Sequence, residues 1–118
     1  MKDTPESQAF LLAVATGQNH QIEALLPAPI FTLGQIVSTP AALEAMQEAN
    51  IDPLSLLRRH ITGDWGDLDK DSKHLNDLAA ERGGSRIFSA YNIGQKQRIW
   101  IITEADRSST CMLKPEDY

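Results

Sequence analysis

The period of the hydrophobic pattern changes at Gly83-Gly84, and this change limits the folds that the chain can adopt. Before the glycine pair, apolar residues recur at helical spacing. After it, apolar and polar residues alternate, as in half-buried strands, over residues 86–93, 98–104 and 110–113. We therefore predict an α+β fold in which N-terminal helices pack on a C-terminal three- to four-stranded antiparallel sheet.

Start signals support the helical part of this prediction. Thr39-Pro40 and Asp52-Pro53 each place a capping side chain before a proline at the first helical position. A fourth strand is expected within residues 30–38, which are rich in β-branched and aromatic side chains. The helices themselves are expected over residues 4–17, 19–27, 39–50, 52–60 and 69–84.

The length of the chain fits one domain, because 118 residues can bury a single core. Within residues 1–118 we expect a helical N-terminal extension over 1–30, a mainly helical part over 31–85 and an antiparallel β-meander over 86–115. Hydrophobic residues make up 42% and charged residues 23% of the sequence. This composition is typical of globular proteins and excludes a disordered chain.

Charge and cysteine content restrict the partners and cofactors. The net charge is -5 and the sequence holds no run of Lys and Arg, so nucleic acid is not an expected ligand. Cys111 is the sole cysteine, which excludes an internal disulfide or a cysteine-based zinc site. No apolar stretch is long enough to cross a membrane and no signal peptide is apparent. We expect a cytoplasmic protein without a cofactor.

Three alternating aspartates raise the question of a calcium site. Asp67, Asp69 and Asp71 have the spacing of the first ligands of a calcium-binding loop. Such a loop also requires glycine at its sixth position and a bidentate acid at its twelfth, where this chain has Ser72 and Leu78. The pattern therefore indicates acidic residues at the start of a helix, and we expect no metal.

The first candidate site lies between two expected helices, in the sequence RRHITGDWGDL. A histidine side chain ordinarily titrates near neutral pH, so His60 is a candidate general acid or base, with Asp64 and Asp67 beside it. The structural alternative is that His60 caps helical carbonyls, that an aspartate caps the next helix and that Trp65 anchors the turn in the core. We favour this structural interpretation.

The second candidate site is the expected hairpin tip TEADRSST. In a metal-independent ribonuclease, Glu104 would take a 2′-hydroxyl proton, Arg107 would hold the phosphate and His60 would protonate the leaving oxygen. The alternative is structural: Asp106 organises the turn, Arg107 pairs with Glu104, and hydroxyls such as that of Ser109 suit the turn and the following strand.

Tyr91 lies on an expected strand, on the same face as Ser89, and is expected to be partly exposed. Together with the two segments above, it would contribute to an acidic, partly aromatic surface that binds another protein. The candidate binding residues are Asp64, Trp65, Asp67, Tyr91, Asp106 and Ser109.

Three stretches within residues 32–118 carry a resemblance: LGQIVSTPAALEAM, RRHITGDWGDL and SAYNIGQKQRIWIITEADRSSTCMLKPEDY. They resemble a family of small bacterial proteins of mobile elements, which are often labelled plasmid-related and in some cases type I restriction subunit M. The chain has no room for a methyltransferase domain and no glycine-rich cofactor loop, so the restriction label does not fit. It departs from the family pattern at SSTCM, around Cys111. The positions that carry the pattern are His60, Gly63, Asp64, Trp65, Gly66, Asp67, Glu104, Asp106 and Arg107.

The resemblance implies a context on mobile DNA and no particular chemistry. Two hypotheses about function remain: the chain is a protein-binding or regulatory module, or it is the ribonuclease described above. The ribonuclease requires His60, Glu104 and Arg107 to line one cleft. The binding module requires an exposed apolar patch with an acidic rim.

Overall fold

The structure, a computed structural model, describes residue 14 and residues 17–118. The helix expected over residues 4–17 lies mostly outside these residues. The described elements are α2 (Asn19–Glu23), β1 (Gln35–Ser38), α3 (Pro40–Glu48), α4 (Pro53–Ile61), α5 (Lys70–Arg82), β2 (Ile87–Gly94), β3 (Gln97–Thr103), β4 (Ser109–Leu113) and the 3-10 helix η1 (Pro115–Asp117).

The helices α3 and α4 begin where their capping residues predict. The Thr39 hydroxyl accepts a hydrogen bond from the Ala42 amide at 3.1 Å, and the Asp52 carboxylate accepts one from Leu54 at 3.0 Å. The predicted caps are thus confirmed, and Gly83 follows the last residue of α5 as expected. Among the helices of the described residues, none combines the length and the apolar character that a bilayer crossing needs.

The four strands form one mixed sheet in the order β1-β4-β3-β2. The strands β2, β3 and β4 form the predicted antiparallel meander. The strand β1 pairs in parallel with β4, with Gln35 opposite Ser109 and Ser38 opposite Met112. This orientation is possible because three helices and two strands separate β1 from β4 in the sequence, which is ample chain for a parallel return. The α+β class is confirmed.

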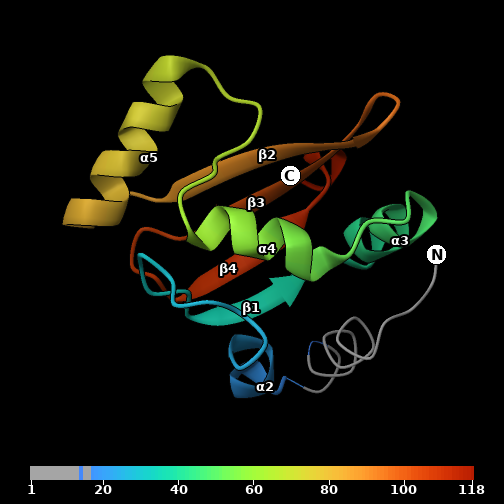
Figure 1. Cartoon of the computed structure of the whole chain (residues 1–118), viewed down its shortest axis with the longest axis horizontal. Helices are drawn as coiled ribbons and strands as arrows, with labels where there is room; N and C mark the ends of the chain where they lie inside the picture. Colours follow the sequence, from blue (N-terminus) through green and yellow to red (C-terminus); the bar gives the residue numbers. More distant parts are fainter. Residues whose placement is uncertain (1–13, 15–16) are drawn as a thin grey trace.

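The hydrophobic core lies between the sheet and the helices that cover one of its faces. Figure 1 shows α4 crossing in front of the strands, with α2 beside β1 and α5 beyond β2. Because successive side chains of a strand point to opposite faces of the sheet, every second residue of β2 and β3 enters the core between the sheet and the helices. The sheet contributes Ile36, Ile87, Tyr91, Ile99, Ile101 and Met112, and the helices contribute Met46, Leu54, Leu57 and Ile61, all fully or almost fully buried.

The two outer strands are covered by asparagine side chains that imitate a neighbouring peptide group. At β2, the Asn76 amide donates to the Phe88 carbonyl at 2.7 Å and accepts from the Phe88 amide at 3.1 Å. At β1, Asn19 accepts from the Ile36 amide at 2.6 Å and donates to the Gly34 carbonyl at 2.9 Å. Both edges therefore satisfy backbone groups that would otherwise need water or another strand.

Replacing Asn76 with alanine should lower the free energy of unfolding by about 2 kcal/mol, because the backbone amide and carbonyl of Phe88 both lose the hydrogen bond that Asn76 makes to them. The higher helix propensity of alanine offsets part of this loss. Asn92→Ala is the matched control, since Asn92 is exposed and its amide lies 3.4 Å from Asp67. Urea denaturation compares the two. An equal effect of both substitutions would contradict the role of Asn76 at the edge.

Candidate functional site

His60 lies in the core and not at the surface. It belongs to the last turn of α4, and its side chain has no solvent exposure. Its Nδ1 lies 2.6 Å from the Ser89 hydroxyl, and its Nε2 lies 3.0 Å from the Thr103 hydroxyl. The rings of Phe31 and Trp65 pack against the imidazole, with centroid distances of 5.3 and 5.9 Å. Both ring nitrogens are therefore occupied, and the polar group is satisfied within the core.

The hydrogen-bond chain fixes the tautomer of His60. The Thr110 hydroxyl donates its one proton to the Leu33 carbonyl at 2.7 Å, so it accepts from Thr103, whose oxygen is 2.7 Å away. The Thr103 proton is then used, and Thr103 must accept from Nε2–H of His60. Nδ1 carries no proton in the neutral ring and accepts from the Ser89 hydroxyl. The chain links α4, β2, β3 and β4 to the segment before β1.

Burial also decides the charge of His60. Because the charged form would lose its hydration, the pKa of His60 is lowered to about 3. The imidazole is neutral near pH 7 and has no path to a substrate. This is a correction to the candidate catalytic role: the three side chains that the ribonuclease needs do not line one cleft, because His60 is inside the core while Glu104 is exposed.

Arg107 holds the hairpin to the end of α5. Its guanidinium donates to the carbonyls of Ala79 and Ser85, both at 2.7 Å, and to the Glu104 carbonyl at 3.0 Å. The bond to Ala79 adds to the one that this carbonyl already accepts from the Gly83 amide, and the bond to Ser85 holds the chain that enters β2. The expected pair with Glu104 thus forms with its main-chain oxygen and not with its carboxylate. Because both terminal nitrogens of the guanidinium donate to backbone carbonyls, Arg107 has a structural role in place of a phosphate contact.

Asp106 and Ser109 shape the same hairpin. The Asp106 carboxylate accepts from the Ser108 amide at 2.9 Å, an Asx turn that matches the structural interpretation of this residue. Hydrogen bonds from Ser108 also lower the pKa of the Asp106 carboxyl. The Ser109 carbonyl accepts from the Glu104 amide at 3.0 Å and begins β4. The polar residues of the tip are therefore used to close the turn.

The segment 62–69 between α4 and α5, here called the tryptophan turn after Trp65, packs against β2. Trp65 is buried, and its Nε1–H donates to the Asp77 carboxylate at 2.9 Å. Tyr91 is buried too, contrary to the expected partial exposure, and its hydroxyl donates to the Asp64 carbonyl at 2.7 Å. Burial raises the pKa of Tyr91. The Asp64 carboxylate pairs with Arg59 at 2.7 Å, which lowers the pKa of Asp64, and the guanidinium stacks 4.5 Å above the Tyr91 ring.

Backbone contacts complete the docking of this turn. The Ala90 amide donates to the Trp65 carbonyl at 3.2 Å, and the Asp67 amide donates to the Ala90 carbonyl at 2.7 Å. The Asp67 carboxylate pairs with Arg98 of β3 at 2.6 Å. The turn thus continues the sheet beyond β2 for one bridge, between Gly66 and Ala90. The tryptophan turn therefore lies against the sheet, and its side chains are engaged in the contacts that hold the turn in place.

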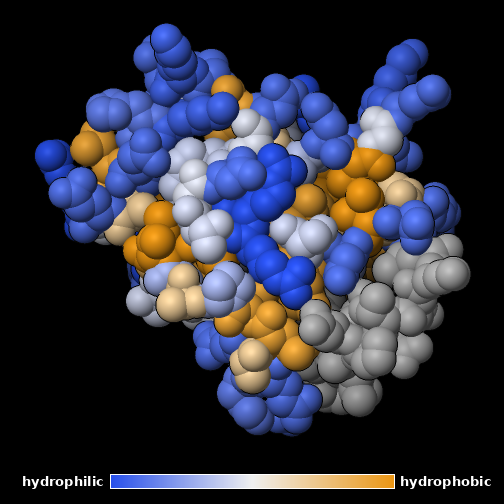
Figure 2. Space-filling view, viewed as in Figure 1, coloured by the Kyte–Doolittle hydropathy of each residue, from blue (hydrophilic) through white to orange (hydrophobic). Residues whose placement is uncertain are grey.

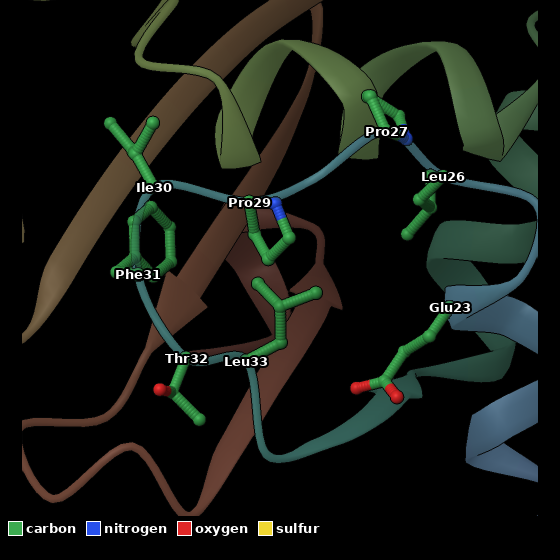
Figure 3. Close-up of a pocket in the computed structure, with 8 residues that line it drawn as sticks. All are labelled: Glu23, Leu26, Pro27, Pro29, Ile30, Phe31, Thr32 and Leu33. Carbon is green, nitrogen blue, oxygen red and sulfur yellow. The ribbon is translucent and has the colours of Figure 1, made fainter.

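A surface that sequence reasoning missed lies in the segment between α2 and β1. The chain curves there around a hollow of about 440 Å3, and Figure 3 shows Leu26, Pro29 and Leu33 turned toward this space, with the Glu23 carboxylate facing it from α2. Ile30 is 52% exposed. The hollow is lined by Glu23, Leu26, Pro27, Pro29, Ile30, Phe31, Thr32 and Leu33.

The apolar surface continues from Ile30 to α5. A second, smaller depression of about 220 Å3 is lined by Ile30, Asp77, Ala80 and Glu81. We call the residues that line these two depressions the Ile30 patch. Figure 2 shows hydrophobic surface over the segment between α2 and β1, with hydrophilic surface on α2 and α5 to either side. The patch therefore has apolar residues at its centre and three carboxylates at its margin.

The patch is tied to the tryptophan turn. Asp77 receives the Trp65 indole proton, and the Ile30 amide donates to the Ile61 carbonyl at the end of α4, at 2.9 Å. The sequence signal that was available is Pro27-Ala28-Pro29, because two residues without amide protons keep this segment out of the sheet and leave the following apolar residues for other contacts.

No family model, no curated protein and no solved structure matches this chain. Among the described residues, no group of three His, Cys, Asp or Glu side chains is placed to hold a metal ion. The Ile30 patch itself is an exposed apolar surface that is bordered by carboxylates.

Proposed function

We propose that this chain is a protein-binding or regulatory module and that the Ile30 patch is its contact surface. The exposure of Ile30, 52% of a large apolar side chain beside a hollow of about 440 Å3, is the observation that supports this most directly. Apolar side chains grouped around a hollow lose contact with water when a partner covers them, and this supplies binding energy. The rigid prolines reduce the ordering cost of the segment.

The margin of the patch indicates the chemistry of the partner. Glu23, Asp77 and Glu81 border it, and no Lys or Arg is among its lining residues. A partner segment with an aliphatic or aromatic side chain flanked by basic residues would match both parts. A basic segment of this kind is common in nucleic-acid-binding proteins, so the module would compete with nucleic acid for a basic groove.

The resemblance to mobile-element proteins supplies the proposed setting, a regulatory protein associated with mobile DNA in the cytoplasm. The ribonuclease alternative is the weaker proposal, because His60 is buried and neutral and Arg107 is bound to backbone carbonyls. The net charge of -5 also opposes an approach to RNA without a basic patch.

A photo-crosslinking amino acid placed at Ile30, and separately at Val37 as a control, would identify the partner in cells. Val37 is also apolar and exposed, at 37%, but it lies on β1 outside the patch. With the purified partner, Ile30→Thr should weaken the affinity by about tenfold, because an apolar contact is replaced by a hydroxyl. Val37→Thr should leave the affinity unchanged. Calorimetry of both variants measures this.

Two results would contradict the proposed module. One is a partner that binds Ile30→Thr and the original chain equally well. The other is RNA cleavage by the purified chain that Arg107→Ala abolishes while the fold is retained, which would favour the ribonuclease.

A further inference from the structure

A third hollow lies on a different side of α5 and is lined by arginines, whereas carboxylates border the Ile30 patch. Its volume is about 370 Å3. It shares no lining residue with the Ile30 patch. We call it the Arg82–Arg86 hollow; its lining residues are Leu75, Leu78, Ala79, Arg82, Gly83, Ser85 and Arg86. The proposed function makes no use of it.

The apolar part of this hollow comes from one side of α5. Leu75 is 64% exposed, and Leu78 follows three residues later on the same side of the helix. A single exposed leucine needs no explanation, but two leucines that line one hollow offer a continuous apolar surface. The entry to β2 forms the opposite wall. Arg107 links the two walls, because its guanidinium donates to the Ser85 carbonyl on one side and to the Ala79 carbonyl of α5 on the other.

The two arginines of the hollow lack carboxylate partners among the described residues. Arg59 and Arg98, in contrast, pair with aspartates at 2.7 and 2.6 Å. Arg86 donates to the Tyr118 hydroxyl at 2.8 Å with one of its five N–H groups, and its guanidinium lies 5.4 Å from the centroid of the same ring. In a chain with net charge -5, two guanidinium groups beside leucines form a local positive surface with unused donors. Guanidinium groups bind carboxylates in a bidentate manner.

We propose that the Arg82–Arg86 hollow binds an acidic segment of a partner protein, with one aliphatic side chain seated on Leu75 and Leu78. Carboxylates on either side of that side chain pair with Arg82 and Arg86. The charge of this partner segment is opposite to that of the segment proposed for the Ile30 patch. The chain therefore presents two recognition surfaces of different specificity on α5 and its neighbours.

The peptide Gly-Glu-Asp-Leu-Asp-Glu-Gly tests this proposal. Titration into the 15N-labelled full chain should shift the backbone amides of Leu75, Leu78, Arg82 and Ser85, with saturation and with weaker binding at higher salt. Leu75→Ala should weaken binding about tenfold, because the apolar contact is lost. Arg82→Gln should weaken it about threefold, as expected for an exposed charge pair. Lys73→Gln removes the same charge from α5 outside the hollow and should have no effect.

Several outcomes would overturn the proposal. These are the absence of saturable shifts at the hollow, equal binding by Arg82→Gln and Lys73→Gln, and equal binding of a peptide with lysine in place of each acid. Decanoate that binds as tightly as the peptide would also overturn it, because the hollow would then be a site for free carboxylates. Ile30→Thr should leave the peptide titration unchanged, so the failure of this site and the failure of the Ile30 patch are separate results.

Discussion

Gly66→Ala is expected to destabilise the protein by about 3 kcal/mol or more, or to prevent folding, because a Cβ at this position overlaps the backbone. Gly66 has φ +80°, and the added atom would collide with the Ala90 carbonyl oxygen and the Tyr91 ring. The collision involves main chain on the β2 side, which cannot move without loss of the bridge between the tryptophan turn and the sheet. Denaturant unfolding followed by Trp fluorescence measures the change.

Gly84→Ala is the matched control for this prediction. Gly84 has a similar φ of +84°, but no atom lies within 4 Å of the position of its Cβ. This substitution should cost about 1 kcal/mol, which is the strain of a left-handed alanine alone. The difference between the two variants isolates the steric overlap. Equal losses at Gly66 and Gly84 would show that the turn does not approach β2 as closely as described.

The stability of the protein should fall as the pH is lowered from about 6.5 toward 3, and His60 should account for the upper part of this range. The folded state lowers the pKa of His60 from the usual 6.5 to about 3, so the unfolded chain binds a proton in this interval while the folded chain does not. Each pH unit then costs up to about 1.4 kcal/mol of stability. The carboxyls with lowered pKa, such as Asp64 and Asp106, add their losses only near and below pH 4.

His60→Gln should flatten the slope of stability against pH between 6.5 and 4.5, even though the variant itself is less stable. His74→Gln, a change at an exposed histidine of α5, should retain the slope. NMR of the original chain gives a direct check: the His60 ring should stay neutral, with the proton on Nε2, from pH 7.5 to 4.5. A ring that titrates near pH 6.5 would contradict both the burial and the hydrogen-bond chain.

The α+β class and most element boundaries could be predicted because their causes are local. The change of period at Gly83-Gly84, the caps Thr39 and Asp52, and the alternation after Gly84 all act over a few residues. The parallel pairing of β1 with β4 could not be predicted in this way. It depends on where β1, a strand of four residues, pairs with β4 across the 70 residues that separate them, and no short-range pattern encodes that choice.

The candidate site was less predictable, since residue type does not give side-chain direction. His60 looked like a titrating group, but Ser89 and Thr103, which satisfy it, are 29 and 43 residues away in the sequence. Arg107 was expected to contact a phosphate or the Glu104 carboxylate, whereas in the structure it donates to the Ala79 carbonyl near the end of α5. Ile30 became a surface residue only because the path after Pro29 turns it outward, which is a property of the tertiary structure.

The asparagines at the sheet margins have a consequence for the behaviour of the protein at high concentration. A bare outer strand can recruit the same strand of another molecule and begin aggregation. Here the side-chain amides of Asn76 and Asn19 hydrogen-bond to backbone groups at the edges of β2 and β1. Those backbone groups are therefore not free to pair with a strand of another molecule. Intermolecular sheet growth would first have to displace hydrogen bonds that the two asparagines already make, which should keep the protein from aggregating through its sheet edges.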